Sequence, residues 1–185
     1  MIPSLLLFAM LHMAGTEPMP SRLAVIRAAP DFTLTDQDGK AIKLSDYKGH
    51  VLLVSFVFTT CNGACPATTH RLARIGTEKG KRKVAFVSIT LDPKRDTCDA
   101  LRRYIKLYDL PPDWTFLTGQ PDAVAKTIEA WGMWVKPAAN GQLDHPSRIF
   151  LVDQKQRIRE VYNVDMLRHS EVLEDIDLLW REWDK

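Results

Sequence analysis

Two of the three cysteines lie four residues apart, and that spacing is the first sign of chemistry in the chain. Cys61 and Cys65 follow a long apolar run and directly precede Pro66. Two sulfurs at i and i+4 on one helical face lie about 5–6 Å apart at Cβ, so they could close a disulfide or bind one ion together. The pair has one residue more than a Cys-x-x-Cys redox centre, and no second pair completes a four-ligand zinc site. The spacing therefore indicates redox or metal chemistry of another kind.

His145 is the strongest candidate for a third donor. It lies in the loop Gly141–Pro146, which leads straight into a predicted strand at Ser147–Val152. Two thiolates and one imidazole form a soft donor set, which suits Cu(I) and can also hold Cu(II). The other histidines are interpreted as leader, surface or capping residues: His12, His50, His70 and His169.

Alternating strands and helices must position these donors. His50–Phe58 and Lys83–Leu91 are apolar, β-branched runs typical of strands buried on both faces. The cysteines follow the first run, at the start of a helix predicted over Pro66–Gly76, where free N–H groups stabilise a thiolate. The full order, a hairpin followed by β-α-β-α-β-α-β-β-α, predicts an α/β domain with a mixed central sheet flanked by helices. The other predicted elements are the hairpin at 32–44, helices at 97–108, 121–131 and 165–183, and strands at 114–117, 147–152 and 157–162.

Length and composition indicate one globular domain. The 185 residues are 45% hydrophobic and 26% charged, which excludes a disordered chain and a miniprotein held together by disulfides. The charge balance is 25 basic minus 23 acidic residues, or +2. Such a small charge gives no strong field, so nucleic-acid binding is not expected.

Residues 1–28 differ from the rest of the chain. Ile2–Met13 is almost wholly apolar, and a small, polar, proline-containing linker follows it. The run is too short for a membrane-spanning helix, which needs about 20 residues. It is interpreted as a signal peptide or anchor remnant, although the first basic residue is Arg22; the alternative is an apolar helix packed on the domain. The globular domain is predicted over residues 29–185.

Several linked motifs stand in a recognisable order: Phe32–Gly39, Thr60-Cys61-x-x-x-Cys65-Pro66, Asp92-Pro93-x-Arg95-Asp96, Trp131–Lys136 and Asp144-His145. On these motifs the chain resembles the Sco/SenC family of thioredoxin-like copper proteins, which help assemble the binuclear copper centre of cytochrome c oxidase. The resemblance covers about residues 29–180. Two positions depart from the family pattern. Asn62 stands where the family often has proline, and Pro146 stands where an apolar residue, Thr or Ser is common, so the isomer of the His145–Pro146 bond is open.

The resemblance implies a thioredoxin-like fold and a copper-binding metallochaperone. It implies that Cys61, Cys65 and His145 are the copper ligands, for Cu(I), Cu(II) or both. The expected partner is a copper-accepting protein, either cytochrome c oxidase subunit II or another copper chaperone. The resemblance implies that the protein is localised on the periplasmic side of the cell envelope, with the N-terminal apolar run as its export signal or membrane tether.

Charged residues near these ligands are candidates for supporting roles. Asp144 either orients the neighbouring imidazole or forms a turn. Asp92 and Arg95, with Asp96, follow the second buried strand and so reach the same sheet edge as the cysteines. They either tune the thiols or meet a partner, or they act in capping and ion pairing, with Asp96 as N-cap of the next helix. Cys98 is interpreted as an incidental thiol.

Two enzymatic alternatives use the same cysteines. In a thiol–disulfide oxidoreductase, Cys61 and Cys65 would cycle between dithiol and disulfide to reduce a partner's cysteines. A peroxidase is less favoured, because peroxiredoxins have Thr three residues before the reactive cysteine and this chain has Phe58 there. Whether the chain is an enzyme therefore depends on whether His145 joins the cysteines around a metal.

Overall fold

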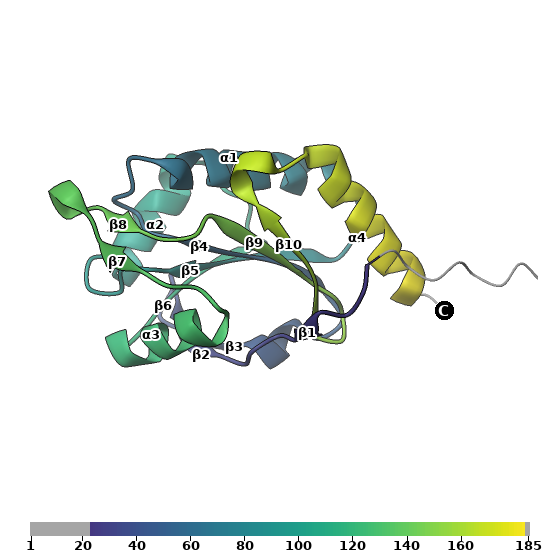
Figure 1. Ribbon diagram of the computed structural model, residues 1–185, viewed down its shortest axis with the longest axis horizontal. Helices are drawn as coiled ribbons and strands as arrows, with labels where there is room; N and C mark the ends of the chain where they lie inside the picture. Colours follow the sequence, from purple (N-terminus) through teal and green to yellow (C-terminus); the bar gives the residue numbers. More distant parts are fainter. Residues whose placement is uncertain (1–22, 184–185) are drawn as a thin grey trace, which may run out of the picture.

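A central mixed sheet carries the fold in the computed structural model, which describes residues 23–183 (Figure 1). Within these residues, eight strands follow the order β1-β10-β9-β4-β5-β6-β2-β3. The middle strand β4 (Val51–Val57) runs parallel to β5 (Val84–Thr90) and antiparallel to β9 (Arg148–Val152). Every residue of β4 and β5 is buried, as their continuous apolar runs predict. The expected mixed sheet is confirmed.

The outer strands extend this sheet on both sides. On one side β6 runs parallel to β5, and the predicted hairpin joins the far edge of β6. On the other side β10 pairs with β9, and β1, a short strand within the predicted linker, pairs with β10. Ordered structure therefore begins before residue 29, and Leu23 is already buried in the core. The bounds are β1 Arg27–Ala28, β2 Thr33–Asp36, β3 Ala41–Lys43, β6 Trp114–Thr118 and β10 Arg157–Asn163.

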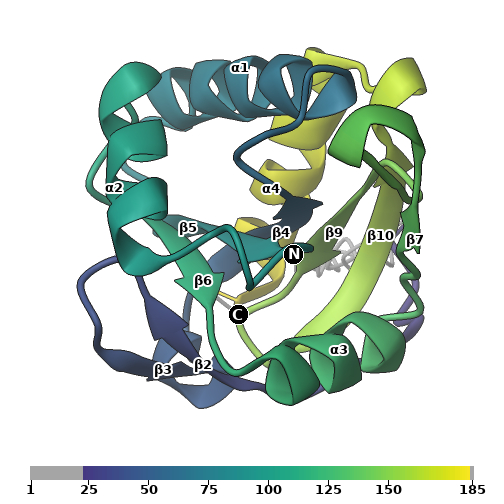
Figure 2. The ribbon, with the colours of Figure 1, turned by 90° about the vertical axis from the view of Figure 1, so that its left-hand side faces the viewer.

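Helices cover both faces of the sheet (Figures 1 and 2). On one face lie α1 (Ala64–Glu78) and α4 (His169–Trp183), and on the other lies α3 (Pro121–Ala130). Beside α1 lies α2 (Cys98–Leu107), and a 2.9 Å hydrogen bond between the hydroxyls of Tyr104 and Thr69 joins the two helices. The helices predicted at 97–108 and 121–131 are confirmed to within a residue.

The last helix begins later than its amphipathic pattern predicts. The pattern predicts a start at residue 165, whereas α4 begins at His169. Val164–Met166 instead forms a separate 3-10 turn, because the Asn163 side chain accepts a hydrogen bond from the Asp165 N–H and caps that turn.

A small second ladder stands apart from the main sheet. It consists of β7 (Lys136–Pro137) and β8 (Leu143–Asp144), which pair antiparallel across a turn at Ala139–Gly141. Asn140 and Gly141 adopt positive φ angles of 57° and 70° in that turn. The sequence predicts only a loop, Gly141–Pro146, before β9.

The apolar leader Ile2–Met13 lies outside the described residues. Among residues 23–183, no helix combines the length and apolar character needed to cross a membrane.

Candidate metal centre

The cysteine loop, residues 58–65, leaves the C-terminal end of β4 and enters α1. Cys61 is half-buried and precedes the helix, while Cys65 lies in the first helical turn and is only 2% exposed. The two cysteines therefore do not share one helical face, and the expected i, i+4 geometry is wrong. They meet because a turn, closed by the Cys61 N–H and the Phe58 carbonyl at 3.2 Å, brings the loop back over the start of α1.

The fully buried carboxylate of Asp96 anchors this loop. It accepts hydrogen bonds from the Thr59 hydroxyl and the Thr90 hydroxyl, each at 2.6 Å, and from the Thr59 N–H at 3.2 Å. It thereby joins the end of β4 to the end of β5. Burial raises the pKa of Asp96 despite these hydrogen bonds. The expected N-cap role is wrong, because Thr97 caps α2 by accepting from the Ala100 N–H at 3.3 Å.

The two thiols have opposite electrostatic environments. The Cys65 thiol hydrogen-bonds to the Cys61 sulfur, and this contact is the main cause that lowers the pKa of Cys61 to about 5. The N–H of Gly63, 3.4 Å from the Cys61 sulfur, acts in the same direction. The same hydrogen bond to Cys61, followed by burial, raises the pKa of Cys65. At neutral pH the pair therefore holds one proton, with the negative charge on the more exposed sulfur.

His145 meets this pair from the other side of the site. Its Nε2 lies 3.9 Å from the Cys65 sulfur, although the two residues are 80 positions apart. Its Nδ1 lies 3.0 Å from the Pro146 carbonyl oxygen, which can only accept, so Nδ1 donates its N–H there. Nε2 is therefore the ring nitrogen that faces the thiols, as the nitrogen of a metal ligand would. The ring of Phe58 packs edge-on against the imidazole, with the centroids 5.9 Å apart.

Cys65 is the centre of this arrangement, since its sulfur lies 3.9 Å from His145 Nε2 and its thiol is the main cause that lowers the pKa of Cys61. Among residues 23–183, no three Cys, His, Asp or Glu side chains already surround one point as a complete metal site. The three donors nevertheless fit a soft ion by type, and Cys61 leaves one side of the site open to solvent. The described residues also contain no cis peptide bond, so the His145–Pro146 bond is trans.

The other candidate residues make their contacts away from the thiols. Asp144 is exposed and belongs to the ladder, where it stands opposite Lys136. Asp92 and Arg95 form an ion pair with each other. Cys98 is separate from the pair and donates its S–H to the Asp36 carbonyl oxygen at 3.4 Å.

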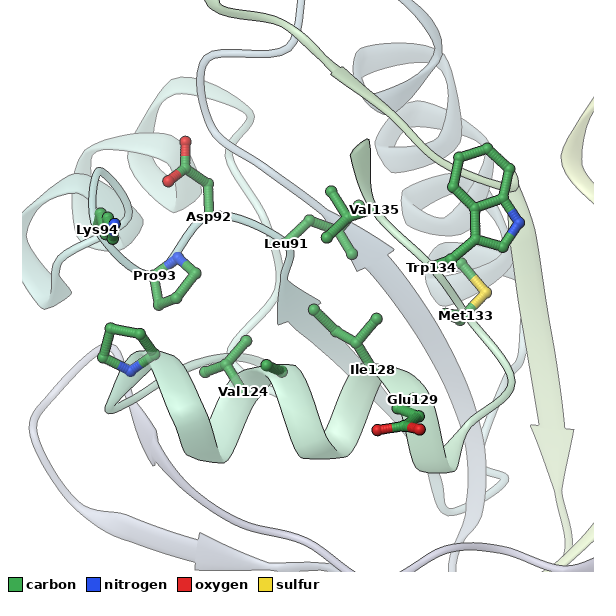
Figure 3. A pocket seen from close by; sticks show the side chains of 12 residues that line it. Leu91, Asp92, Pro93, Lys94, Val124, Ile128, Glu129, Met133, Trp134 and Val135 are labelled. Carbon is green, nitrogen blue, oxygen red and sulfur yellow. The ribbon is translucent and has the colours of Figure 1, made fainter. Parts of the chain in front are cut away.

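Asp92 also borders an apolar groove of about 490 Å³ (Figure 3). Val124 and Ile128 rise from α3 towards Leu91 and Val135. Trp134 closes one side and remains 44% exposed. This lining offers no thiol or imidazole, so the groove is distinct from the donor cluster.

The chain matches the SCO1/SenC family over residues 22–181. It is 30% identical over 152 residues to the SCO1 protein homolog of Bacillus subtilis, covering 78% of this chain and 79% of the relative.

Two solved structures share the architecture. A SCO1/SenC family lipoprotein from Bacillus anthracis is 28% identical, with a TM-score of 0.77 and coverage of 83% of this chain and 95% of the other. The copper-bound ScoI of Bradyrhizobium japonicum is 29% identical, with a TM-score of 0.72 and coverage of 81% and 98%. The expected thioredoxin-like fold is thereby confirmed. The chain belongs to the SCO1/SenC family.

Proposed function

We propose that this protein is a copper metallochaperone, which binds one copper ion as cargo through Cys61, Cys65 and His145. The observation that carries the proposal is the 3.9 Å approach of His145 Nε2 to the Cys65 sulfur, between loops that are distant in sequence. The copper-bound relative from Bradyrhizobium japonicum supports the same cargo. Two thiolates favour Cu(I), and the imidazole extends the range to Cu(II).

The exposure of Cys61 suits delivery by ligand exchange. An acceptor's own ligand can reach the ion on the side of this half-buried sulfur, while Cys65 and His145 hold it from behind. The proposed acceptor is cytochrome c oxidase subunit II, or another copper chaperone, during maturation of the binuclear copper centre. We further propose that the protein works on the periplasmic side of the cell envelope, as an exported or anchored protein.

Titration of the reduced protein with Cu(I), against a competing chromophoric chelator, tests the proposal. The wild type should bind one ion, Cys61→Ser and Cys65→Ser should bind none, and His145→Ala should bind much more weakly than the wild type. His70→Ala is the matched control, because His70 is exposed on α1 beside Tyr108. Wild-type affinity in all three ligand variants would place the copper elsewhere and overturn the proposal.

A second candidate function is thiol–disulfide exchange, favoured by the opposite pKa shifts of the two cysteines. The Cys61 thiolate would attack a partner's disulfide and release one of its thiols. Cys65 would then displace the second thiol from the mixed disulfide. Two electrons and two protons thus pass to the partner, and Cys61–Cys65 becomes the disulfide. Turnover on a disulfide substrate that survives His145→Ala, with no copper affinity in the wild type, would favour this function over the first.

A further inference from the structure

The side-chain amide of Gln142 binds the cysteine loop at two points. Its Oε1 accepts from the Asn62 N–H at 3.2 Å, and its Nε2 donates to the Thr60 carbonyl oxygen at 3.0 Å. Thr60 and Asn62 are the two neighbours of Cys61. One amide group therefore holds the backbone on both sides of the exposed cysteine, as a strand would hold its neighbour.

The backbone of Gln142 is itself fixed. Its carbonyl oxygen accepts from the Ala138 N–H at 2.9 Å, and its N–H donates to the Ala139 carbonyl oxygen at 3.1 Å. The extended strand β8 follows at once, and His145 comes three residues after Gln142, about 10 Å along an extended chain. A contact at Gln142 therefore limits how far the imidazole can move away from the thiols.

The contact needs a backbone N–H at position 62. Proline has no N–H, so a proline at this position could not donate to Gln142. Asn62 supplies that N–H while its side chain takes no part in the contact. Gln142 and Asn62 thus form a pair whose two halves come from different loops.

We propose that Gln142 is a positioning residue, which clamps the histidine loop (residues 136–146) onto the backbone around Cys61 and so holds His145 ready for copper. This inference rests on the proposed copper function and adds a residue that supplies no ligand. Without the clamp, the histidine loop must become ordered when copper binds. The entropy cost of that ordering weakens copper binding. Loss of an outer contact to a metal ligand typically costs tenfold to a hundredfold in affinity, and about tenfold is expected here because both hydrogen bonds are exposed.

Copper affinity of Gln142→Ala is the first measurement. The variant should bind one Cu(I) about tenfold more weakly than the wild type. Its urea midpoint should not change, and its thiolate-to-Cu(II) charge-transfer band should weaken as the ligands lose their fixed geometry. Gln120→Ala, an exposed glutamine at the start of α3, is the control and should match the wild type. Equal copper affinity of Gln142→Ala and the wild type would overturn the clamp and leave the proposed function standing.

A double-mutant cycle separates the hydrogen bond from other effects of proline. Asn62→Ala keeps the N–H and should bind copper as the wild type does. Asn62→Pro should weaken binding in the wild type and add little in the Gln142→Ala background, because the partner of the N–H is already gone. Equal effects of Asn62→Pro in both backgrounds would contradict the pairing.

Amide hydrogen exchange of the reduced, copper-free protein tests the clamp without any metal. Exchange at Asn62 should be about tenfold faster in Gln142→Ala than in the wild type, since the protecting acceptor is lost. Unchanged exchange would overturn the inference whatever the copper result. A wild type that binds no copper but shows this exchange difference would instead refute the proposed function and retain the contact between the loops.

Discussion

The loops that carry the donors meet at one end of the molecule but are held there by different means (Figure 2). The cysteine loop leaves a fully buried strand, enters a 15-residue helix and is anchored by the buried Asp96 carboxylate. The histidine loop, residues 136–146, rests on a ladder of two residues per strand and a turn with positive φ angles. The core of the fold therefore fixes the two thiols, whereas the imidazole depends on contacts between loops.

The largest expected effect is on the anchor of the cysteine loop. Asp96→Ala should lower the free energy of unfolding by about 3 kcal/mol, because it leaves an N–H and two hydroxyls without their buried acceptor. Urea unfolding measures this loss. Asp96→Asn keeps the shape and one acceptor oxygen, so it should cost about 1 kcal/mol. A loss below 1 kcal/mol in the alanine variant would show that the cysteine loop is no better anchored than the histidine loop.

The pH dependence of Asp96 gives a second measure of the same anchor. Burial raises the pKa of Asp96 in the folded protein, so folding favours its protonated form. This contribution to the free energy of unfolding is fully present at a pH below the pKa that Asp96 has in the unfolded chain. It is lost as the pH rises through the pKa that Asp96 has in the folded protein. The free energy of unfolding of the wild type, relative to the neutral Asp96→Asn variant, should therefore fall over that pH range.

The two cysteines of the cysteine loop should differ in their rates of alkylation. Because the pKa of Cys61 is lowered to about 5, its reaction with iodoacetamide in the reduced protein should rise through that pH and then level off. Cys65 is buried and its pKa is raised, so at pH 6 it should react about a hundredfold more slowly. Peptide mapping by mass spectrometry gives both rates. Equal labelling of the two cysteines at pH 6 would contradict the assignment of the charge to Cys61.

A smaller effect is expected in the turn of the histidine loop. Gly141→Ala places a side chain at φ +70°, with its Cβ 3.4 Å from Arg95 Nη1, and should cost about 1 kcal/mol of unfolding free energy. Gly49→Ala is the matched control, because Gly49 has φ +82° and open space around it. Both variants should lose similar stability, but Gly141→Ala alone should weaken copper binding. Equal copper affinities would mean that the turn does not position His145.

The cysteine loop could be predicted from the sequence far better than the histidine loop. An apolar run, a cysteine pair and a following helix are local patterns, and the structure places β4, Cys65 and α1 close to where they indicate. The ladder β7–β8 has two residues per strand, too few to show any periodicity. His145 could be chosen only because its loop leads into β9 and because the family resemblance points to it.

Asp96 and Gln142 show what the sequence could not reveal. An aspartate before a helix is a normal N-cap, and Thr97 beside it serves that role equally well. Asp96 instead accepts hydrogen bonds from Thr59 and Thr90, because the packing of β4 beside β5 brings these hydroxyls to it. The partners of Gln142 are about 80 residues away, so no local pattern reveals them.

The smallest expected effect belongs to a cysteine outside both loops. Cys98 lies at the start of a helix, as Cys65 does, but its S–H is directed to the Asp36 carbonyl oxygen of β2, which lies three strands away from β4 in the sheet. A serine hydroxyl can donate to the same oxygen, so Cys98→Ser should change the free energy of unfolding by less than about 0.5 kcal/mol. It should still bind one equivalent of Cu(I). A cysteine at a helix start binds copper only where a second thiol and an imidazole lie beside it, as they do for Cys65. Loss of a full equivalent of copper in Cys98→Ser would show instead that the copper site extends beyond the cysteine loop and the histidine loop. The difference between these two loops would then no longer explain where the metal binds.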